Sequence, residues 1–147
     1  MNYSISNILE SEYTDVVEVW EASVRATHHF LKEEDIAYYK PLILNEYLKS
    51  VNLRCVRNEQ HCIIGFLGVA AEKIEMLFIH PDHRGQGIGK TLVGYAFQEF
   101  QVSQVDVNEE NIQAIGFYEC LGFKTVGRVD RDHTRKPYPI LQMELNR

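Results

Sequence analysis

A chain of 147 residues, of which 45% are hydrophobic and 24% charged, can bury a core of its own, and this excludes a wholly disordered protein. The net charge of -6 argues against nucleic acid as a partner, because that affinity comes largely from lysine and arginine on phosphates. No apolar run approaches the roughly 20 residues of a membrane-spanning helix, and residues 1–10 carry no secretory signal, so we expect a cytoplasmic protein that does not enter the membrane.

The first third of the chain predicts one strand and two helices. Residues 3–8 alternate apolar and polar side chains, which is the period of a half-buried strand. Ser11 is placed to cap a helix. The buried face of that helix is formed by residues at helical spacing, Tyr13, Val17, Trp20 and Val24. Residues 33–49 predict a second helix, which Pro41 should kink or divide in two.

The rest of the chain predicts six strands and two helices. The expected strands are residues 51–57, 62–69, 73–79, 105–107, 123–129 and 140–145. A helix over 88–100 follows a glycine-rich loop, and a helix over 111–121 ends at Gly122, a residue that favours a helix C-terminus. The order β-α-α-β-β-β-α-β-α-β-β predicts an α+β fold around one mixed sheet. Because no repeat or linker divides the chain, we expect residues 1–147 to form one domain, as a monomer or a homodimer.

The cysteines and histidines give no sign of a metal site. Cys55, Cys62 and Cys120 are odd in number and show no CxxC spacing, which also argues against a disulfide framework. The adjacent histidines at 28–29 rarely point the same way, and Pro81 forbids a helix between the next two histidines. We therefore expect no metal ion.

Residues 74–91 carry the clearest chemical signal. A strand leads into the loop Arg84-Gly85-Gln86-Gly87-Ile88-Gly89, which runs directly into a helix. Glycine removes the side chain where the backbone must approach another group closely. Free N–H groups at a helix start attract phosphate, and the planar charged fork of Arg84 suits phosphate oxygens. The loop is therefore suited to a ligand that carries a pyrophosphate.

Two other phosphate-binding loops do not match. The Walker A pattern of nucleotide-binding proteins ends in Gly89-Lys90-Thr91, but its first glycine would fall at Arg84. The dinucleotide fingerprint GxGxxG fails because the glycines at 85, 87 and 89 spell GxGxG. Neither a magnesium nucleotide nor a dinucleotide is the expected ligand.

The loop resembles the R/Q-x-x-G-x-G/A signature of the GNAT acetyltransferases, and the likeness extends from end to end of the chain. The resemblance implies a mostly antiparallel sheet with helices on both faces, and acetyl-CoA as co-substrate. It implies that the loop holds the CoA pyrophosphate through Arg84, Gly85, Gln86, Gly87, Ile88, Gly89 and Lys90. It also implies that the preceding strand meets the pantetheine arm and the acetyl carbonyl at Leu77, Phe78 and Ile79.

Residues 111–123 resemble a second signature of the family, N-x-x-A-x-x-F-Y-x-x-x-G-F. Asn111 should cap this helix, and Asn111, Ala114 and Tyr118 share one helix face. A small residue between two polar ones leaves room for a ligand chain. The resemblance implies that Asn111 lies beside CoA and that the Tyr118 hydroxyl approaches the sulfur, where it acts as the general acid.

The expected activity is transfer of an acetyl group from acetyl-CoA to a primary amine of a small molecule, a peptide or a protein. The amine must lose a proton to attack. Glu75, Asp106 and His80 are candidate general bases, and we rank Glu75 first because it resembles a position where some family members place a glutamate. The alternative is a non-catalytic domain that binds acyl-CoA, which has no need of Tyr118 as an acid.

The loops expected to line the acceptor cleft contain His28, Phe30 and Tyr138. The first helix and the segment after it carry acids that favour a cationic amine, namely Glu18, Glu21, Glu33, Glu34 and Asp35. Arg135 and Lys136, beside Tyr138, favour an acceptor that also carries a carboxylate, such as an amino acid or a peptide.

Overall fold

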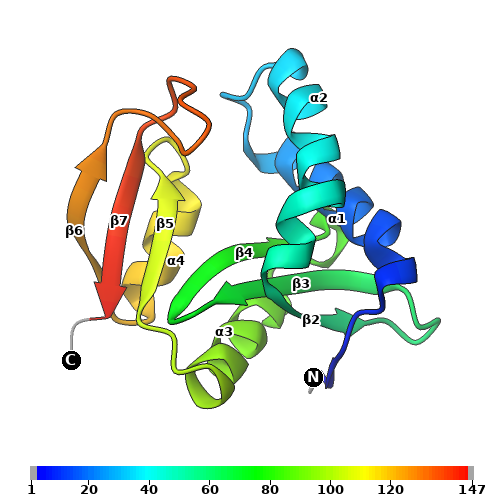
Figure 1. Ribbon diagram of the computed structural model, residues 1–147. Coiled ribbons are helices and arrows are strands. Elements are labelled where there is room, and N and C mark those ends of the chain that lie inside the picture. The colour runs from blue at the N-terminus through cyan, green and yellow to red at the C-terminus, as the bar shows by residue number, and fades with distance from the viewer. Residues whose placement is uncertain (1–2, 146–147) are drawn as a thin grey trace.

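A computed structural model describes residues 3–145 of the chain. Within this range seven strands form one sheet in the order β1-β2-β3-β4-β5-β7-β6 (Figure 1). The strands are β1 (Ile5–Ser6), β2 (Asn52–Arg57), β3 (Ile63–Ala70), β4 (Lys73–Ile79), β5 (Gln104–Asn108), β6 (Phe123–Val129) and β7 (Ile140–Leu145). All neighbouring strands are antiparallel except β4 and β5, which are parallel. The expected mixed, mostly antiparallel sheet is confirmed.

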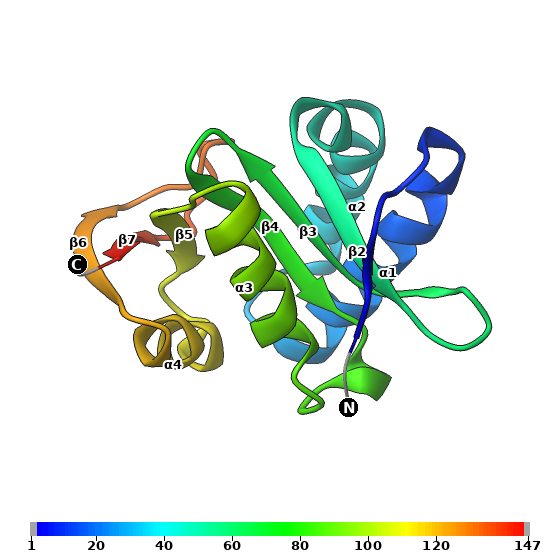
Figure 2. The ribbon, with the colours of Figure 1, turned by 90° about the horizontal axis from the view of Figure 1, so that it is seen from below.

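Helices cover both faces of the sheet, which confirms the α+β prediction. They are α1 (Tyr13–Thr27), α2 (Glu33–Leu42), α3 (Ile88–Glu99) and α4 (Ile112–Cys120). The first two lie on one face and the last two on the other (Figures 1 and 2). Each face has a hydrophobic core of its own. Trp20 of α1 belongs to one core with Phe66, and Leu92 of α3 belongs to the other with Leu67. Neighbouring residues of β3 thus supply both cores, as strand alternation requires.

The sheet divides between β4 and β5. These strands pair only at Lys73 with Gln104 and at Ile74 with Val105. Beyond those pairs they diverge into a V, with β2, β3 and β4 in one arm and β5, β7 and β6 in the other (Figure 1). The remainder of β4 therefore has a strand partner on one edge only.

Two expectations near the N-terminus were wrong. The first strand covers only Ile5–Ser6 rather than residues 3–8. Ser11 does not cap α1, because it lies inside a 3₁₀ turn (Glu10–Glu12) and Glu12 occupies the cap position. The Glu12 carboxylate accepts the Leu9 amide at 3.0 Å, which closes the turn before α1 begins.

The predicted second helix changes its winding after Pro41. The α-helix ends at Leu42 and continues as a π-helical turn (Ile43–Tyr47) and a 3₁₀ turn (Leu48–Ser50). Proline has no amide hydrogen, so the carbonyl four residues earlier loses its helical partner. The expected interruption is confirmed as a change of winding in one continuous segment.

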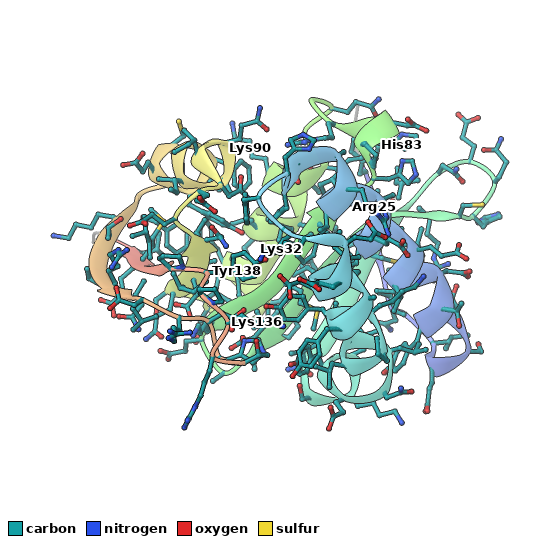
Figure 3. All side chains as sticks on the ribbon, turned by 90° about the horizontal axis from the view of Figure 1, so that it is seen from above. Arg25, Lys32, His83, Lys90, Lys136 and Tyr138 are labelled. Atoms are coloured by element: carbon teal, nitrogen blue, oxygen red, sulfur yellow. The ribbon has the colours of Figure 1, made fainter. Side chains whose placement is uncertain are left out.

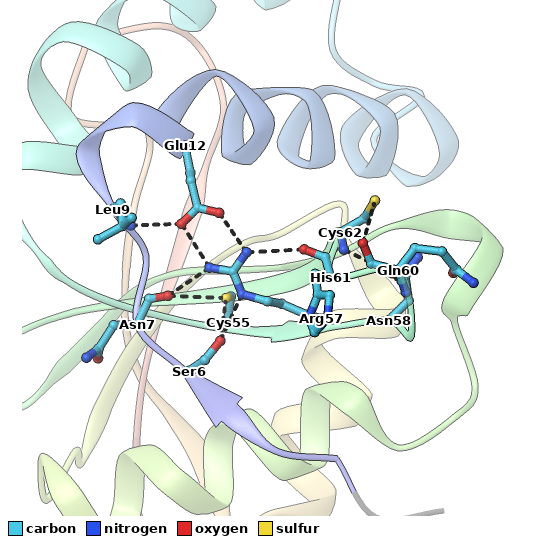
Figure 4. Close-up of polar contacts among 10 residues, drawn as sticks. All are labelled: Ser6, Asn7, Leu9, Glu12, Cys55, Arg57, Asn58, Gln60, His61 and Cys62. Atoms are coloured by element: carbon cyan, nitrogen blue, oxygen red, sulfur yellow. Dashed lines mark hydrogen bonds and ion pairs between the residues drawn. The ribbon is translucent and has the colours of Figure 1, made fainter.

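An ion pair fastens the N-terminal segment to the end of β2 (Figure 4). The two terminal nitrogens of Arg57 donate to the two carboxylate oxygens of Glu12 at 2.6 and 2.8 Å. Arg57 also donates to the Asn7 carbonyl at 3.0 Å. The hydrogen bonds from Arg57 hold the pKa of Glu12 at about 2, below its usual value of 4.5.

We expect Glu12→Gln to lower the free energy of unfolding by about 1–2 kcal/mol at neutral pH, because a bidentate, part-buried pair is stronger than an exposed one. The pKa of Glu12 is depressed in the folded state, so the pair stabilises fully above pH 4.5 and its contribution is lost as the pH falls toward 2. Urea denaturation across this range measures the difference between the variant and the wild type. Glu10→Gln removes a charge from the same turn and serves as the control. A difference that stays constant down to about pH 2 would contradict the ion-pair account.

Candidate active site

A cavity of about 500 Å³ lies where β4 and β5 diverge. Its lining includes these sequence-predicted residues: His28, Glu75, Leu77, Phe78, Ile79, Arg84, Gly85, Gly87, Ile88, Gly89, Lys90, Asn111 and Tyr118. Gln86 does not line it, and its side chain instead accepts the Tyr3 hydroxyl at 2.9 Å. The fold thus brings the two sequence signatures to one cavity.

The three glycines of the loop differ in how much free space surrounds them. Gly85 and Gly87 have φ angles of 75° and 84°, and a Cβ built on either would meet no described atom within 4 Å. Gly87 is the N-cap of α3, so its neighbourhood is open space beside free helix amides. A Cβ on Gly89 would lie 3.4 Å from the Phe117 ring, at van der Waals contact, so the space here is bounded by α4. The first two positions fit a bound phosphate group.

Two positively charged side chains lie beside the N-terminus of α3. Arg84 and Lys90 are exposed and both line the cavity. The Arg84 guanidinium donates to the Gln113 side chain at 3.0 Å, so it reaches from the loop to α4. Two cations beside a helix N-terminus suit the charge of a pyrophosphate.

The edge of β4 that faces the cavity has free backbone groups. The His80 amide donates to the Ile64 carbonyl at 2.8 Å, so by antiparallel alternation the Phe78 amide also faces β3. The amides of Leu77 and Ile79 face the opposite way, into the gap that β5 leaves. These two amides have no strand partner, so they can donate hydrogen bonds to a ligand that lies along this edge.

Glu75 is the extra residue of a β-bulge. Gly68 on β3 pairs with Met76 and Val69 pairs with Ile74, which leaves Glu75 with no opposing residue. Bulges redirect a side chain, and Glu75 lines this cavity and a second one beside it. The sequence could not reveal the bulge, because it is defined by the register with β3.

The other two candidate bases are engaged elsewhere. Asp106 lines the first cavity but forms an ion pair with Lys73 at 2.5 Å, across the start of the V. The His80 ring accepts the Asp82 amide at 3.1 Å, which caps the 3₁₀ turn (Pro81–His83). Of the three, Glu75 alone borders both cavities.

Tyr118 is buried in α4 and is only 6% exposed. Its ring packs edge-on against Phe117 and Phe123, with centroids 5.1 and 5.5 Å away. No hydrogen bond joins its hydroxyl to another residue in the range 3–145, and burial raises its pKa above the usual value of 10. The phenol therefore stays protonated at the cavity wall, as a proton donor must.

His28 connects the end of α1 to the start of α4. Its Nε2 lies 3.4 Å from the Asn111 side-chain amide, and its Nδ1 lies 2.7 Å from the Thr27 hydroxyl. The Thr27 hydroxyl donates to the Ser23 carbonyl, which assigns the ring proton to Nδ1. Burial lowers the pKa of His28 to about 4, and the nearby Arg84 contributes to this, so the ring is neutral. Asn111 also caps α4 as expected, accepting the Ala114 amide at 3.2 Å.

The second cavity, of about 220 Å³, lies beside the first. The residues common to both are His28, Glu75, Met76, Phe78 and Asn108. Tyr138 lines the second cavity as expected. Phe30 does not line it, but its ring packs between His28 at 5.1 Å and Tyr138 at 6.2 Å, behind the wall.

Two reciprocal pairs, which we call the clasp, join α2 to the loop between β6 and β7. Tyr39 of α2 donates to Asp132 of the loop, and Tyr138 of the loop donates to Asp35 of α2. In Figure 3 the Tyr138 and Lys136 side chains lie between the two halves of the molecule, next to Lys32. The clasp bridges the V above the second cavity. Sequence reasoning missed Tyr39 and Asp132, because 93 residues separate them and no local pattern links them.

The ion pairs change the interpretation of the charges that were expected to attract an acceptor. Lys136 was expected to attract a carboxylate, yet its ammonium forms an ion pair with Asp35 at 2.9 Å. Glu33 and Glu21, which were counted as attracting a cation, are both paired with Arg25. The pair of Lys136 with Asp35 joins the loop before β7 to α2, whereas the two pairs of Arg25 lie within α1 and at the start of α2.

Within residues 3–145, no helix is long and apolar enough to cross a membrane. The same range contains no group of three or more histidine, cysteine, aspartate or glutamate side chains placed to hold a metal ion. Cys55 is buried, Cys62 and Cys120 are exposed, and all three are free thiols.

Known proteins match this arrangement closely. A family model described as acetyltransferase (GNAT) domain matches residues 52–125. The peptidyl-lysine N-acetyltransferase YjaB of Salmonella typhimurium is 38% identical over 97% of this chain and 98% of its own. The apo solution structure of YjaB from Escherichia coli has a TM-score of 0.87 at 37% identity, over 98% of this chain and 97% of that one. An N-acetyltransferase from Thermoplasma acidophilum, crystallised with coenzyme A, shares the fold with a TM-score of 0.72 at 23% identity, over 98% and 99% of the two chains.

These matches and the divided sheet define the class, an acyltransferase that draws its acyl group from acetyl-CoA. More particularly, the chain belongs to the GNAT acetyltransferase family. The resemblance carried by the loop and by α4 is thereby confirmed, and the family relation supports acetyl transfer to an amine.

We expect Gly87→Ala to weaken acetyl-CoA binding about tenfold, or about 1.4 kcal/mol, because the new methyl group occupies the space beside the α3 amides. Gly122→Ala is the control, since Gly122 also has a positive φ, 102°, but lies outside the cavity. Both variants should lose about 1–2 kcal/mol of stability from strain. Calorimetric titration measures affinity and denaturation measures stability. Equal acetyl-CoA affinity in the two variants would remove Gly87 from the binding site.

Proposed function

We propose that this protein transfers the acetyl group of acetyl-CoA to the ε-amine of a lysine in a peptide or protein. The observation that carries the proposal is the meeting of two cavities at Glu75. One cavity has the open loop and free amides suited to the donor, and the other is lined largely by rings. Direct transfer requires donor and amine to meet at one point. Two relatives named peptidyl-lysine N-acetyltransferase, at 38% and 37% identity, support lysine as the acceptor.

The second cavity suits an unbranched amine chain. Trp20, Phe78 and Tyr138 offer ring surface to methylene groups, and Glu75 lies at the inner end where the ammonium would arrive. A lysine side chain brings four methylenes and a terminal charge in this order. Because Lys136 is already paired with Asp35, it does not favour an acceptor that carries a carboxylate of its own.

The donor would lie along the free edge of β4. The loop amides with Arg84 and Lys90 would bind the pyrophosphate, and Asn111 would lie beside the pantetheine arm. Acetyl-CoA supplies an acetyl thioester whose carbonyl carbon is open to attack. The Leu77 amide, which faces the gap, would stabilise the negative charge that develops on the carbonyl oxygen.

Two side chains would carry out the proton transfers. Glu75, through a water molecule, would take a proton from the lysine ammonium, whose pKa is about 10.4 when free. The nitrogen lone pair forms the new C–N bond as the C–S bond breaks. Tyr118 would protonate the departing sulfur. As it becomes an amide, the nitrogen loses a second proton, which replaces the proton that Tyr118 donated.

An acceptor comparison tests the proposal. Release of CoA from acetyl-CoA is followed with a lysine peptide whose N-terminus is blocked, the same peptide with arginine for lysine, a peptide with a free N-terminus and no lysine, and spermidine. We expect rapid release with the first peptide alone. Tight acetyl-CoA binding without release on any acceptor would instead indicate a non-catalytic acyl-CoA-binding domain.

We expect Tyr118→Phe to lower kcat about 100- to 10,000-fold while leaving acetyl-CoA affinity within about twofold, since the hydroxyl acts as the thiolate leaves. Tyr95→Phe is the matched control, because the Tyr95 hydroxyl accepts Arg54 at 3.0 Å outside both cavities. Single-turnover kinetics measure the chemical step. A Tyr118→Phe enzyme with the wild-type rate would exclude Tyr118 as the acid.

We expect Glu75→Gln to lower kcat/KM most at low pH, where more of the amine is protonated and a base matters more. The loss should shrink as the pH approaches the amine pKa of about 10.4. Glu72→Gln, an exposed change in the turn before β4, controls for the loss of one charge. A loss of the same size at every pH would assign Glu75 a binding or structural role.

A further inference from the structure

The polar side chains around the outer part of the second cavity are bonded to one another. The clasp engages two tyrosine hydroxyls and two carboxylates. The Tyr47 hydroxyl and the His133 ring lie 2.9 Å apart. Asp132 also accepts the Thr134 hydroxyl at 2.6 Å and its amide at 2.9 Å. These groups have their partners within the protein and do not need a ligand to satisfy them.

What this cavity offers to a ligand is therefore mostly apolar. Its lining includes Trp20, Leu31, Ile43, Met76, Phe78 and Ile140. Glu75 stands at the inner end, where the first cavity begins. An uncharged chain entering from the first cavity would pass Glu75 and reach apolar surface beyond it. Removal of such a chain from water is favourable in proportion to the area buried.

The acyl group of the proposed donor would lie beside this apolar surface. If the donor follows the free edge of β4 from the loop toward the bulge, its thioester comes to lie near Met76 and Phe78. Both side chains line both cavities, so the two cavities are adjacent at this point. An acetyl group ends at the junction, and each further methylene would extend into the second cavity.

We propose that the second cavity is also a binding site for the acyl chain of medium-chain acyl-CoA, with a saturated chain of about six carbons. Such a donor binds more tightly than acetyl-CoA and excludes the amine acceptor, since both need the same space. This inference rests on the donor position in the proposed function. It adds a ligand class, a longer-chain acyl-CoA that acts as an inhibitor of acetyl transfer.

The expected effect follows from methylene burial. Each fully buried methylene strengthens binding about fourfold, so the four extra methylenes of hexanoyl-CoA have an upper limit of about 200-fold. Because burial in an open cavity is partial, we expect at least about tenfold tighter binding of hexanoyl-CoA than of acetyl-CoA, with butyryl-CoA between them.

Calorimetric titration of the full chain with acetyl-, butyryl- and hexanoyl-CoA tests this order. Leu31→Trp adds bulk to the wall of the second cavity, and Leu9→Trp is the matched control at a position that is 65% exposed. The affinity gain with chain length should vanish in Leu31→Trp, which keeps its acetyl-CoA affinity, and should persist in Leu9→Trp. Ile140→Trp repeats the test on another element in case Leu31→Trp does not fold.

Equal or weaker binding of hexanoyl-CoA in the wild type overturns the proposal, as does a gain that survives in both cavity variants. Hexanoyl-CoA should also support transfer to a lysine peptide at least about tenfold more slowly than acetyl-CoA, because its chain occupies the acceptor space. Equal rates with the two donors would place the chain elsewhere. Acetyl transfer to the lysine peptide by the wild type reports on the proposed function alone, so a failure of the proposed function can be told apart from a failure of the acyl-chain site.

Discussion

The early end of pairing between β4 and β5 is the constraint on which the site depends. After two residue pairs the strands diverge, and the amides of Leu77 and Ile79 face a gap in the middle of the sheet. Elsewhere in a sheet such groups would bond to the next strand, whereas here they have no strand partner. A sheet edge inside the molecule is thus a place for a linear ligand with its own hydrogen-bonding groups. The bulge at Glu75 lies at the apex of the gap, and the open end of α3 lies at the other end of β4.

The two arms of the V are held together at three places by different interactions. At its apex β4 and β5 are joined by two residue pairs and by the ion pair of Lys73 with Asp106. Above the cleft, the clasp connects α2 to the loop before β7. The contact of His28 with Asn111 forms a third connection, which crosses between the first cavity and α4. The walls of the two cavities are therefore parts of one bonded framework, and five residues line both cavities.

Sequence reasoning succeeded where a local pattern determines the conformation. The helix that begins at Ile88 after the glycine-rich loop, Asn111 as a helix cap and Gly122 after a helix end each follow from the neighbouring residues, and the structure confirms all three. It failed where partners are far apart in the chain. Ser11 was a reasonable cap by residue type, but the carboxylate of Glu12, drawn to Arg57 on β2, formed the turn instead. The pairing of Lys136 with Asp35, the contact of His28 with Asn111 and the place of Tyr39 and Asp132 in the second cavity arise from packing between distant elements, for which periodicity gives no signal.

The account is tested most directly by residue-resolved hydrogen exchange along β4, measured by NMR with and without acetyl-CoA. The amides of Leu77 and Ile79 should exchange rapidly in the free protein and at least about tenfold more slowly with saturating acetyl-CoA, because the ligand supplies the missing partners. The Phe78 amide, which faces β3, is the internal reference and should be protected in both states. Leu77 and Ile79 amides already protected in the free protein, or unchanged by acetyl-CoA, would contradict the claim that the gap between β4 and β5 is the donor site.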